Sequence, residues 1–157
     1  MRRCSLSTDC WDEVQRQISE HSYMAGIERT VARVAATAEI FTPTALVIEM
    51  LRRLPIDSFG PGKNVLDPAC GDGQFLVAAK WLKICHFEMS KSEALGEIFG
   101  IDIMSDNVEL CRARLGGGTI VVGDAINPDR KVPGQSEDDR RVLLELFNGA
   151  TQLDLFS

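Results

Sequence analysis

The chain has 157 residues, of which 45% are hydrophobic and 25% are charged, and its formal net charge is −6. This length and composition predict one compact domain that buries enough apolar surface to fold without a disulfide or a structural metal. The five cysteines form no Cys-x-x-Cys pair and no cluster with histidine, so we expect reduced thiols and no metal site. The sequence shows no apolar leader and no membrane-spanning run, so we expect a cytoplasmic protein with no membrane contact.

The charge is unevenly distributed along the chain. Residues 1–63 carry eight Lys/Arg and eight Asp/Glu, whereas residues 64–157 carry nine and fifteen. Proteins that grip nucleic acid on their own usually present a basic face. The acidic C-terminal part therefore predicts weak independent binding to DNA, unless a partner positions the chain on it.

The N-terminal third of the chain is predicted to be helical. Apolar residues recur at helical spacing through residues 8–38, around Gly26. Thr42 can cap a further helix whose first residue is Pro43 and which runs to about Leu54. Residues 55–63, which contain Gly-Pro-Gly, are predicted to form a loop. We assign residues 1–56 to this helical lead-in.

From residue 64 onward, short apolar runs alternate with helical patterns, which is typical of βαβ units and a parallel sheet. Strands are predicted at residues 65–67, 98–101 and 119–122. A long helix and a polar insert at residues 88–97 separate the first two strands. Between the last two, Ser105 can cap a helix that ends at the three glycines 116–118. Residues 57–126 form the predicted βαβαβ core.

The alternation stops after residue 126. Residues 127–140 are polar and contain two prolines, which predicts a loop or linker. Ser136 can cap a last helix that has an acidic first turn and ends at Gly149. Residues 127–150 are therefore assigned to a linker and C-terminal helix, and residues 151–157 to a tail.

A glycine-rich turn follows the first predicted strand. Gly71 and Gly73 let a ligand approach the backbone between the strand end at Asp67 and the next helix. The neighbouring strands end in Asp102 and Asp124, so three carboxylates are expected at one edge of the sheet. Asp102 is placed to accept hydrogen bonds from two ribose hydroxyls. Because three acids would repel a phosphate, the pattern predicts an adenosine-containing ligand without a pyrophosphate.

Four elements occur in order and at suitable spacing: Phe-Thr-Pro at 41–43, Asp-Pro-Ala-Cys-Gly-Asp-Gly-Gln-Phe-Leu at 67–76, Gly-Ile-Asp at 100–102 and Gly-Asp-Ala at 123–125. Over about residues 38–126 the chain resembles the DNA adenine N6-methyltransferases. The order of the elements is similar to that of the γ group, which includes the modification subunits of type I restriction-modification systems. The resemblance implies an α/β fold, a truncated Rossmann-like class I S-adenosylmethionine-dependent methyltransferase fold with an N-terminal helical region.

The resemblance also implies S-adenosylmethionine as the cofactor and assigns residues to its parts. The first two elements would surround the methionine moiety, Asp102 would bind the ribose, and Asp124 would bind the adenine amino group. The predicted set is Phe41, Thr42, Asp67, Pro68, Ala69, Gly71 and Gly73 at the methionine end, and Asp102, Ile103, Asp124 and Ala125 at the ribose and adenine.

The family's catalytic loop, Asp/Asn-Pro-Pro-Tyr/Phe after a fourth strand, has no full counterpart in the sequence. In that loop, polar groups hold the amino group of a flipped adenine and the aromatic ring stacks on its face. The partial match Asn-Pro-Asp-Arg at 127–130 lacks the second proline and the aromatic residue, and it follows the third strand directly. Asn127 is therefore a weak candidate catalytic residue, and the usual target-recognition region is also missing.

The missing strands are expected to leave one edge of the first strand without a neighbour. Such an edge favours association with other chains. We expect the helix near residues 137–148, a second copy of the chain, or another protein to cover it.

The C-terminal tail carries a separate pattern. Residues 152–156 resemble the pentapeptide by which bacterial polymerases and repair factors bind the replicative sliding clamp. Its apolar side chains would fill a pocket on the clamp and its glutamine would hydrogen-bond there. The alternative is a terminal turn packed back on the core. The residues concerned are Gln152, Leu153, Asp154, Leu155 and Phe156.

Two functions follow from these patterns. The first is an S-adenosylmethionine-binding DNA adenine N6-methyltransferase, or one part of a split enzyme whose catalytic loop comes from Asn127 or from a partner chain. The second is a catalytically inactive methyltransferase-like protein that binds the sliding clamp through its tail. Small size, an incomplete enzyme core and a clamp peptide together suggest a phage or other mobile-element origin.

Overall fold

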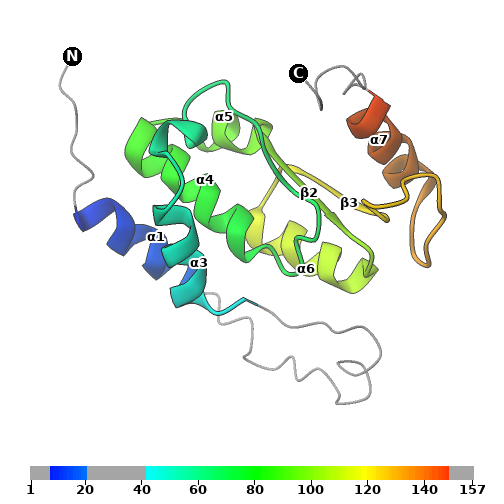
Figure 1. The fold of residues 1–157 in the computed structure, drawn as a ribbon, viewed down its shortest axis with the longest axis horizontal. Coiled ribbons are helices and arrows are strands. Elements are labelled where there is room, and N and C mark those ends of the chain that lie inside the picture. Colours follow the sequence, from blue (N-terminus) through cyan, green and yellow to red (C-terminus); the bar gives the residue numbers. More distant parts are fainter. Residues whose placement is uncertain (1–7, 21–41, 149–157) are drawn as a thin grey trace.

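The computed structural model describes residues 8–20 and 42–148, which form a small parallel sheet with helices on both faces (Figure 1). The strands are β1 (Val65–Asp67), β2 (Ile98–Asp102) and β3 (Thr119–Val122), in the spatial order β1-β2-β3. Both pairings are parallel, with Leu66 opposite Phe99 and Gly100 opposite Ile120. The predicted strands and the parallel sheet are therefore confirmed, with β2 one residue longer than expected.

Helices α4 (Gln74–Phe87) and α6 (Ser105–Leu115) cover one face of the sheet, and the short α5 (Lys91–Gly96) lies in the polar insert before β2. The inner face of α6 is fully buried at Val108, Cys111 and Leu115, at the spacing expected of an amphipathic helix. Gly116 ends α6 in the left-handed conformation, with φ of +71°, as the run of glycines predicts.

On the outer side of α4 lie α1 (Thr8–Glu20) and α3 (Thr44–Arg52). Val14 and Ile18 of α1 are buried in the main core, which confirms the helical pattern for residues 8–20. The rest of that pattern, residues 21–38, lies outside the described residues. A short 3-10 helix, η1 (Ile56–Phe59), forms within the segment that we predicted as a loop.

Two predicted helix starts are wrong by one residue each. Pro43 lies before α3 in an extended conformation, so Thr44 is the first helical residue and Thr42 does not cap it; the helix also ends at Arg52 rather than near Leu54. Ser105 is the first residue of α6, not its cap. Met104 precedes the helix and makes no side-chain cap hydrogen bond.

A fully buried lysine ties the segment before β1 to α4. The Lys83 ammonium donates to the backbone oxygens of Phe59 (3.2 Å), Gly60 (3.3 Å) and Lys63 (2.7 Å). It also pairs with Glu97 at 2.5 Å, just before β2. One buried cation therefore fixes the position of η1, the loop after it and the start of the second strand relative to α4.

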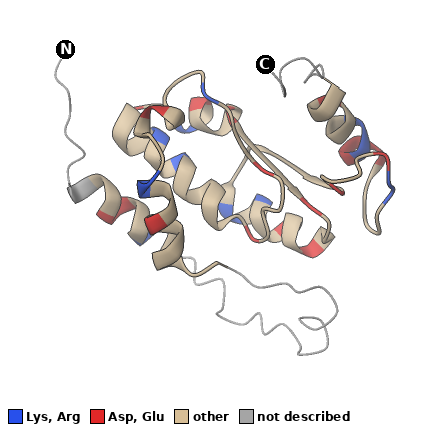
Figure 2. Ribbon diagram, in the orientation of Figure 1, with Lys and Arg blue, Asp and Glu red and all other residues tan. Residues whose placement is uncertain are grey.

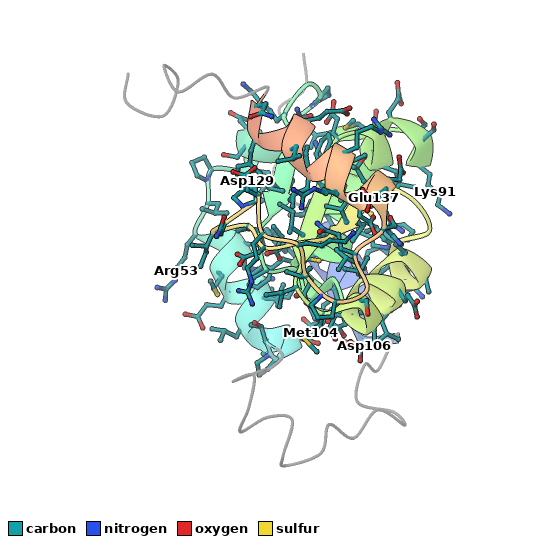
Figure 3. All side chains as sticks on the ribbon, turned by 90° about the vertical axis from the view of Figure 1, so that its right-hand side faces the viewer. Arg53, Lys91, Met104, Asp106, Asp129 and Glu137 are labelled. Carbon is teal, nitrogen blue, oxygen red and sulfur yellow. The ribbon has the colours of Figure 1, made fainter. Side chains whose placement is uncertain are left out.

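The helix α7 (Glu137–Asn148) covers the opposite face of the sheet, where Leu143 packs against Ile101 and Val121. Figure 3, which faces this side, shows Glu137 at the start of α7 and Asp129 in the loop that leads to it. The predicted cap is confirmed, because the Ser136 hydroxyl accepts a hydrogen bond from the Asp139 backbone N–H at 3.0 Å.

Of the three alternatives expected to cover the outer edge of β1, the first, this helix, is wrong. α7 packs against β3, because Ile101 and Val121 supply the apolar surface that its own stripe needs. A Cβ on Gly123 would lie 2.5 Å from a methyl carbon of Leu143, so the contact is close. Arg112 of α6 also pairs with Asp139 of α7 at 2.6 Å.

Charged residues are mixed over the surface elements. Figure 2 shows acidic and basic positions interspersed along the helices, with no single basic face in the part of the chain drawn in colour. Within the described ranges, no helix is both long and apolar enough to cross a membrane.

Candidate functional site

An aspartate lies at the carboxyl end of each strand, either as its last residue or two residues after it. Each of these aspartates accepts a hydrogen bond from the backbone N–H two positions later. This arrangement is an Asx turn, in which the side chain imitates a backbone turn. The carboxyl ends of parallel strands meet at one edge of the sheet, so the structure gathers the three predicted carboxylates there. The bonds are Ala69 N to Asp67 Oδ1 (3.1 Å), Met104 N to Asp102 Oδ1 (2.8 Å) and Ile126 N to Asp124 Oδ1 (3.0 Å).

The glycine turn between β1 and α4 is held against the end of β2. Asp102 Oδ2 accepts a hydrogen bond from the Gly71 N–H at 2.9 Å, and the Cys70 N–H donates to the Ile101 carbonyl at 2.9 Å. Gly73 has φ of +91°, and a Cβ there would lie 2.6 Å from the Cys111 sulfur. These glycines are therefore needed by the packing of the turn itself.

A pocket of about 110 Å³ lies beside this turn. Whole ligands usually occupy pockets of about 300–1,000 Å³, so this pocket matches one end of an extended ligand rather than all of it. Four of its lining residues belong to the set predicted for the methionine end of the cofactor. The lining consists of Thr42, Asp67, Ala69, Cys70, Gly71, Asp72, Gln74 and Phe75.

Asp67 is the acidic group in this pocket whose environment favours a cationic ligand. Burial raises the pKa of its carboxyl above the ordinary value of 3.8, the N–H of Ala69 opposes that rise, and the negative charge of Asp102 adds to it. Among the described residues, no hydrogen-bond donor reaches its Oδ2 atom. A partly buried carboxylate with one free oxygen gains most from a positive group placed beside it.

Most hydrogen-bond acceptor positions of the Asp102 carboxylate are occupied by groups of the protein itself. Its carboxylate accepts from the Gly71 and Met104 backbone N–H groups and from the side-chain amide of Asn107 at 3.3 Å. A carboxylate has about four acceptor positions, so about one remains for a ligand hydroxyl. The bond from the Met104 N–H forms the turn that leads from β2 into α6.

The loop after β3 is organised by Asp124. Its Oδ1 accepts from the backbone N–H groups of Ile126 and Asn127, and Oδ2 pairs with Arg130 at 3.2 Å. Chiefly the hydrogen bond from Asn127, with help from Ile126 and Arg130, lowers the pKa of this carboxyl. Ala125 packs against the apolar cluster under α7.

The remaining predicted residues lie in several places. Gly73 is buried behind the pocket, Pro68 lines a separate apolar groove, and Ile103 is 42% exposed. Asn127 is exposed in a turn closed by a hydrogen bond from the Arg130 N–H to its carbonyl. Two sets of predicted positions, Phe41 and 152–156, lie outside the described residues.

Sequence reasoning missed part of the pocket lining. Asp72 and Gln74 were within the recognised stretch 67–76, and their place between the glycines and the first helical turn was the available signal. Cys70, in the same stretch, is a small buried residue of the turn: contact with Cys111 and burial both raise the pKa of its thiol, which keeps it neutral.

The comparison with known families decides where this site belongs. The family model for N-6 DNA Methylase matches residues 23–116, which is more than half of the chain. The chain belongs to the N-6 DNA methylase family. The match contains Thr42, the glycine turn and Asp102, and it ends before β3 and Asp124. No solved structure matches the chain significantly.

The residues of the pocket fit the cofactor of this family at its amino-acid end. S-adenosylmethionine carries an ammonium and a sulfonium, and Asp67 presents a partly buried carboxylate with a free oxygen. The pocket size matches that end of the molecule and not the nucleoside, which would extend toward Asp102.

Proposed function

We propose that this chain binds S-adenosylmethionine, with the amino-acid end in the pocket beside the glycine turn. Asp67 is the observation that carries the proposal, since its free oxygen and raised pKa suit the ammonium group. Thr42, Ala69 and Gly71 complete that end of the site. When bound, the cofactor would supply an electrophilic methyl group for transfer to nitrogen.

The nucleoside is assigned to the neighbouring strand ends. Asp102 accepts a ribose hydroxyl at its remaining acceptor position, and the exposed Ile103 packs against the adenine ring. Asp124 binds the adenine amino group beside Ala125, in competition with Arg130 for Oδ2. Phe41 belongs to the same set on sequence grounds alone.

The reaction proposed for the site is methylation of adenine N6 in DNA. The direct route is attack of the amino nitrogen on the methyl group, in which the sulfur–methyl bond would break, S-adenosylhomocysteine would leave and the nitrogen would lose a proton to solvent. This route needs polar groups to hold the amino group and an aromatic surface for the flipped base. Asn127 lies five residues after the end of β3 and is followed by Pro-Asp-Arg. The chain is therefore proposed as one part of a split enzyme, whose partner brings the aromatic catalytic loop and most of the grip on DNA.

The outer edge of β1 is the proposed docking place for that partner. Val65 donates to Glu97 on the β2 side at 2.8 Å, so in a parallel ladder the N–H and C=O of Leu66 point to the other side. Leu66 is 47% exposed, and an apolar groove of about 230 Å³ runs beside it, lined in part by Leu54, Phe59 and Phe75. An extended apolar strand of another polypeptide satisfies both features.

Calorimetric titration with S-adenosylmethionine tests the binding proposal. Asp102→Ala should weaken binding by about tenfold or more, the effect of losing a hydrogen bond to a charged group. Glu109→Ala removes an exposed acid of α6 and serves as the matched control. Thermal melting of both variants shows that each is folded. No binding by the unaltered protein, or equal binding by Asp102→Ala, overturns the proposed site.

The partner proposal has its own test. Light scattering distinguishes a second copy at the β1 edge from a monomer that awaits another polypeptide. Leu66→Lys places a charge on that edge and should abolish association with the polypeptide that completes methylation, while leaving cofactor binding unchanged. Self-association that Leu66→Lys abolishes would identify a homodimer instead.

A second candidate function rests on the tail sequence. Residues 152–156 are proposed to bind the bacterial sliding clamp, because they match its peptide ligand at every position. Deletion of residues 152–157 should abolish binding to a purified clamp, and Leu155→Ala with Phe156→Ala should do the same in the full chain. Unchanged binding after the deletion contradicts this function.

A further inference from the structure

Arg114 is a nearly buried cation that does not line the pocket but holds two residues that do. It lies in the last turn of α6, with 8% of its side chain exposed, and pairs with Asp72 at 2.8 Å. The same guanidinium nitrogen also donates to the Asp72 backbone carbonyl at 3.1 Å. Its second terminal nitrogen donates to the side-chain oxygen of Gln74 at 2.7 Å. Arg114 therefore grips both ends of the short segment that joins the glycine turn to α4.

The contacts continue beyond these two residues. The amide nitrogen of Gln74 donates to the Thr44 hydroxyl at 3.3 Å, at the first residue of α3. Thr44 is two residues from Thr42, which lines the pocket from the segment before α3. The chain of contacts from Arg114 through Gln74 thus links the two segments between which the pocket is formed.

The positive charge of Arg114 also affects the electrostatics of the pocket. Asp72 has 4% of its side chain exposed and lines the same pocket as Asp67, and the guanidinium of Arg114 balances its negative charge there. A guanidinium suits this place because its planar fork donates to several oxygens in fixed directions, which an ammonium does not. The arrangement neutralises Asp72 and leaves Asp67 as the carboxylate that faces a ligand.

We propose that Arg114 is a positioning residue for the amino-acid end of S-adenosylmethionine. It acts through Asp72 and Gln74, which set the distance between the glycine turn and the segment that carries Thr42. This inference rests on the proposed cofactor site and adds the residue that shapes it.

The experiment compares two ligands that differ in the amino-acid end. S-adenosylmethionine has that end, and 5′-methylthioadenosine has the same nucleoside without it. Arg114→Lys should weaken binding of S-adenosylmethionine by about tenfold or more, because misplacing contact groups by an ångström carries a large loss. Binding of 5′-methylthioadenosine should stay within about twofold. Isothermal titration, with competition for the weaker ligand, measures both.

Two further variants keep the result decisive. Arg112→Lys is the matched control, since Arg112 is an arginine of the same helix that bonds the Ile120 carbonyl and Asp139 instead. It should leave both affinities unchanged. Gln74→Met keeps the side-chain length, cuts the link to Thr44 without changing a charge, and should reproduce the selective loss if Arg114→Lys fails to fold.

The outcomes separate this inference from the function on which it rests. Unchanged affinity for S-adenosylmethionine in Arg114→Lys, or an equal loss for both ligands, overturns the positioning role while the cofactor site stands. Absence of binding by the unaltered protein overturns the proposed function and the positioning role together.

Discussion

Replacing Lys83 by methionine should destabilise the protein strongly, although a lysine in the middle of a helix would ordinarily be replaceable. The Lys83 side chain is 0% exposed and its ammonium faces three backbone oxygens and Glu97. Methionine fills a similar volume but, among the described residues, leaves the carbonyl oxygens of Phe59 and Lys63 without a donor, whereas the Gly60 oxygen keeps its hydrogen bond from the Lys63 N–H at 3.1 Å. Phe59 is buried, whereas Glu97 is 19% exposed and can reach water.

The magnitude follows from the groups left without a donor. Each buried acceptor without a partner costs about 1–3 kcal/mol, and breaking a buried ion pair costs about 3–5 kcal/mol, so we expect a loss of about 3–5 kcal/mol. For a domain of this size, that loss corresponds to a fall in Tm of roughly 6–20 °C. It is a large part of the total stability of about 5–15 kcal/mol that is usual for a domain.

The assay is unfolding by urea and by heat, followed by circular dichroism. Lys80→Met is the matched control, because Lys80 is also buried on α4 but makes one hydrogen bond, to the Leu115 carbonyl at 3.1 Å. Its loss should cost about 1 kcal/mol, the usual net value of one hydrogen bond. Adding Glu97→Gln to Lys83→Met should restore part of the stability. If Lys83→Met costs no more than Lys80→Met, the assigned role of Lys83 is refuted.

Three further predictions concern the site and the sheet. Asp67→Asn should raise Tm at neutral pH and weaken S-adenosylmethionine binding. Burial raises the pKa of Asp67 in the folded state, so ionisation of this carboxyl lowers the stability of the protein as pH rises above about the ordinary value of 3.8. A gain in Tm that persists in acid contradicts this explanation. Gly73→Ala combines a φ of +91° with a contact of 2.6 Å and should cost about 2–5 kcal/mol in urea unfolding. The control Gly62→Ala, with φ of +79° and open space, should cost about 1–2 kcal/mol. Leu143→Ala should cost about 2–5 kcal/mol, and calorimetry showing no loss would mean that α7 is not held by its apolar stripe.

The strands were predictable because each is a short apolar run with a polar or glycine boundary on both sides. The pocket was predictable in part for a similar reason: acids and glycines at strand ends have few structural alternatives in a parallel sheet. The short helix α5 could also have been predicted from the sequence, because Ser90 and Glu93 form a capping box that our sequence analysis did not identify.

The parts that sequence reasoning missed depend on contacts between distant residues. Ser105 has the chemistry of a cap, but after the turn made by Asp102 the helix begins one residue earlier, at Ser105 itself. In the sequence, Lys83 and Arg114 have the character of solvent-facing helix residues. Nothing in the neighbouring sequence indicates that Lys83 contacts backbone carbonyls or that Arg114 pairs with Asp72. The position of α7 depended on which apolar surface of the sheet was left open, which only the packed sheet reveals.

The three Asx turns have a consequence for how such chains change over time. An aspartate at each strand end forms its turn whether or not a ligand is present, since the bond from the N–H two residues later is internal. Selection for a well-made loop alone is therefore enough to retain an aspartate or an asparagine at all three positions. A lineage that lost the cofactor would keep the turns, while replacement of an acid such as Asp67 by asparagine would record the loss of the charge that a cationic ligand needs.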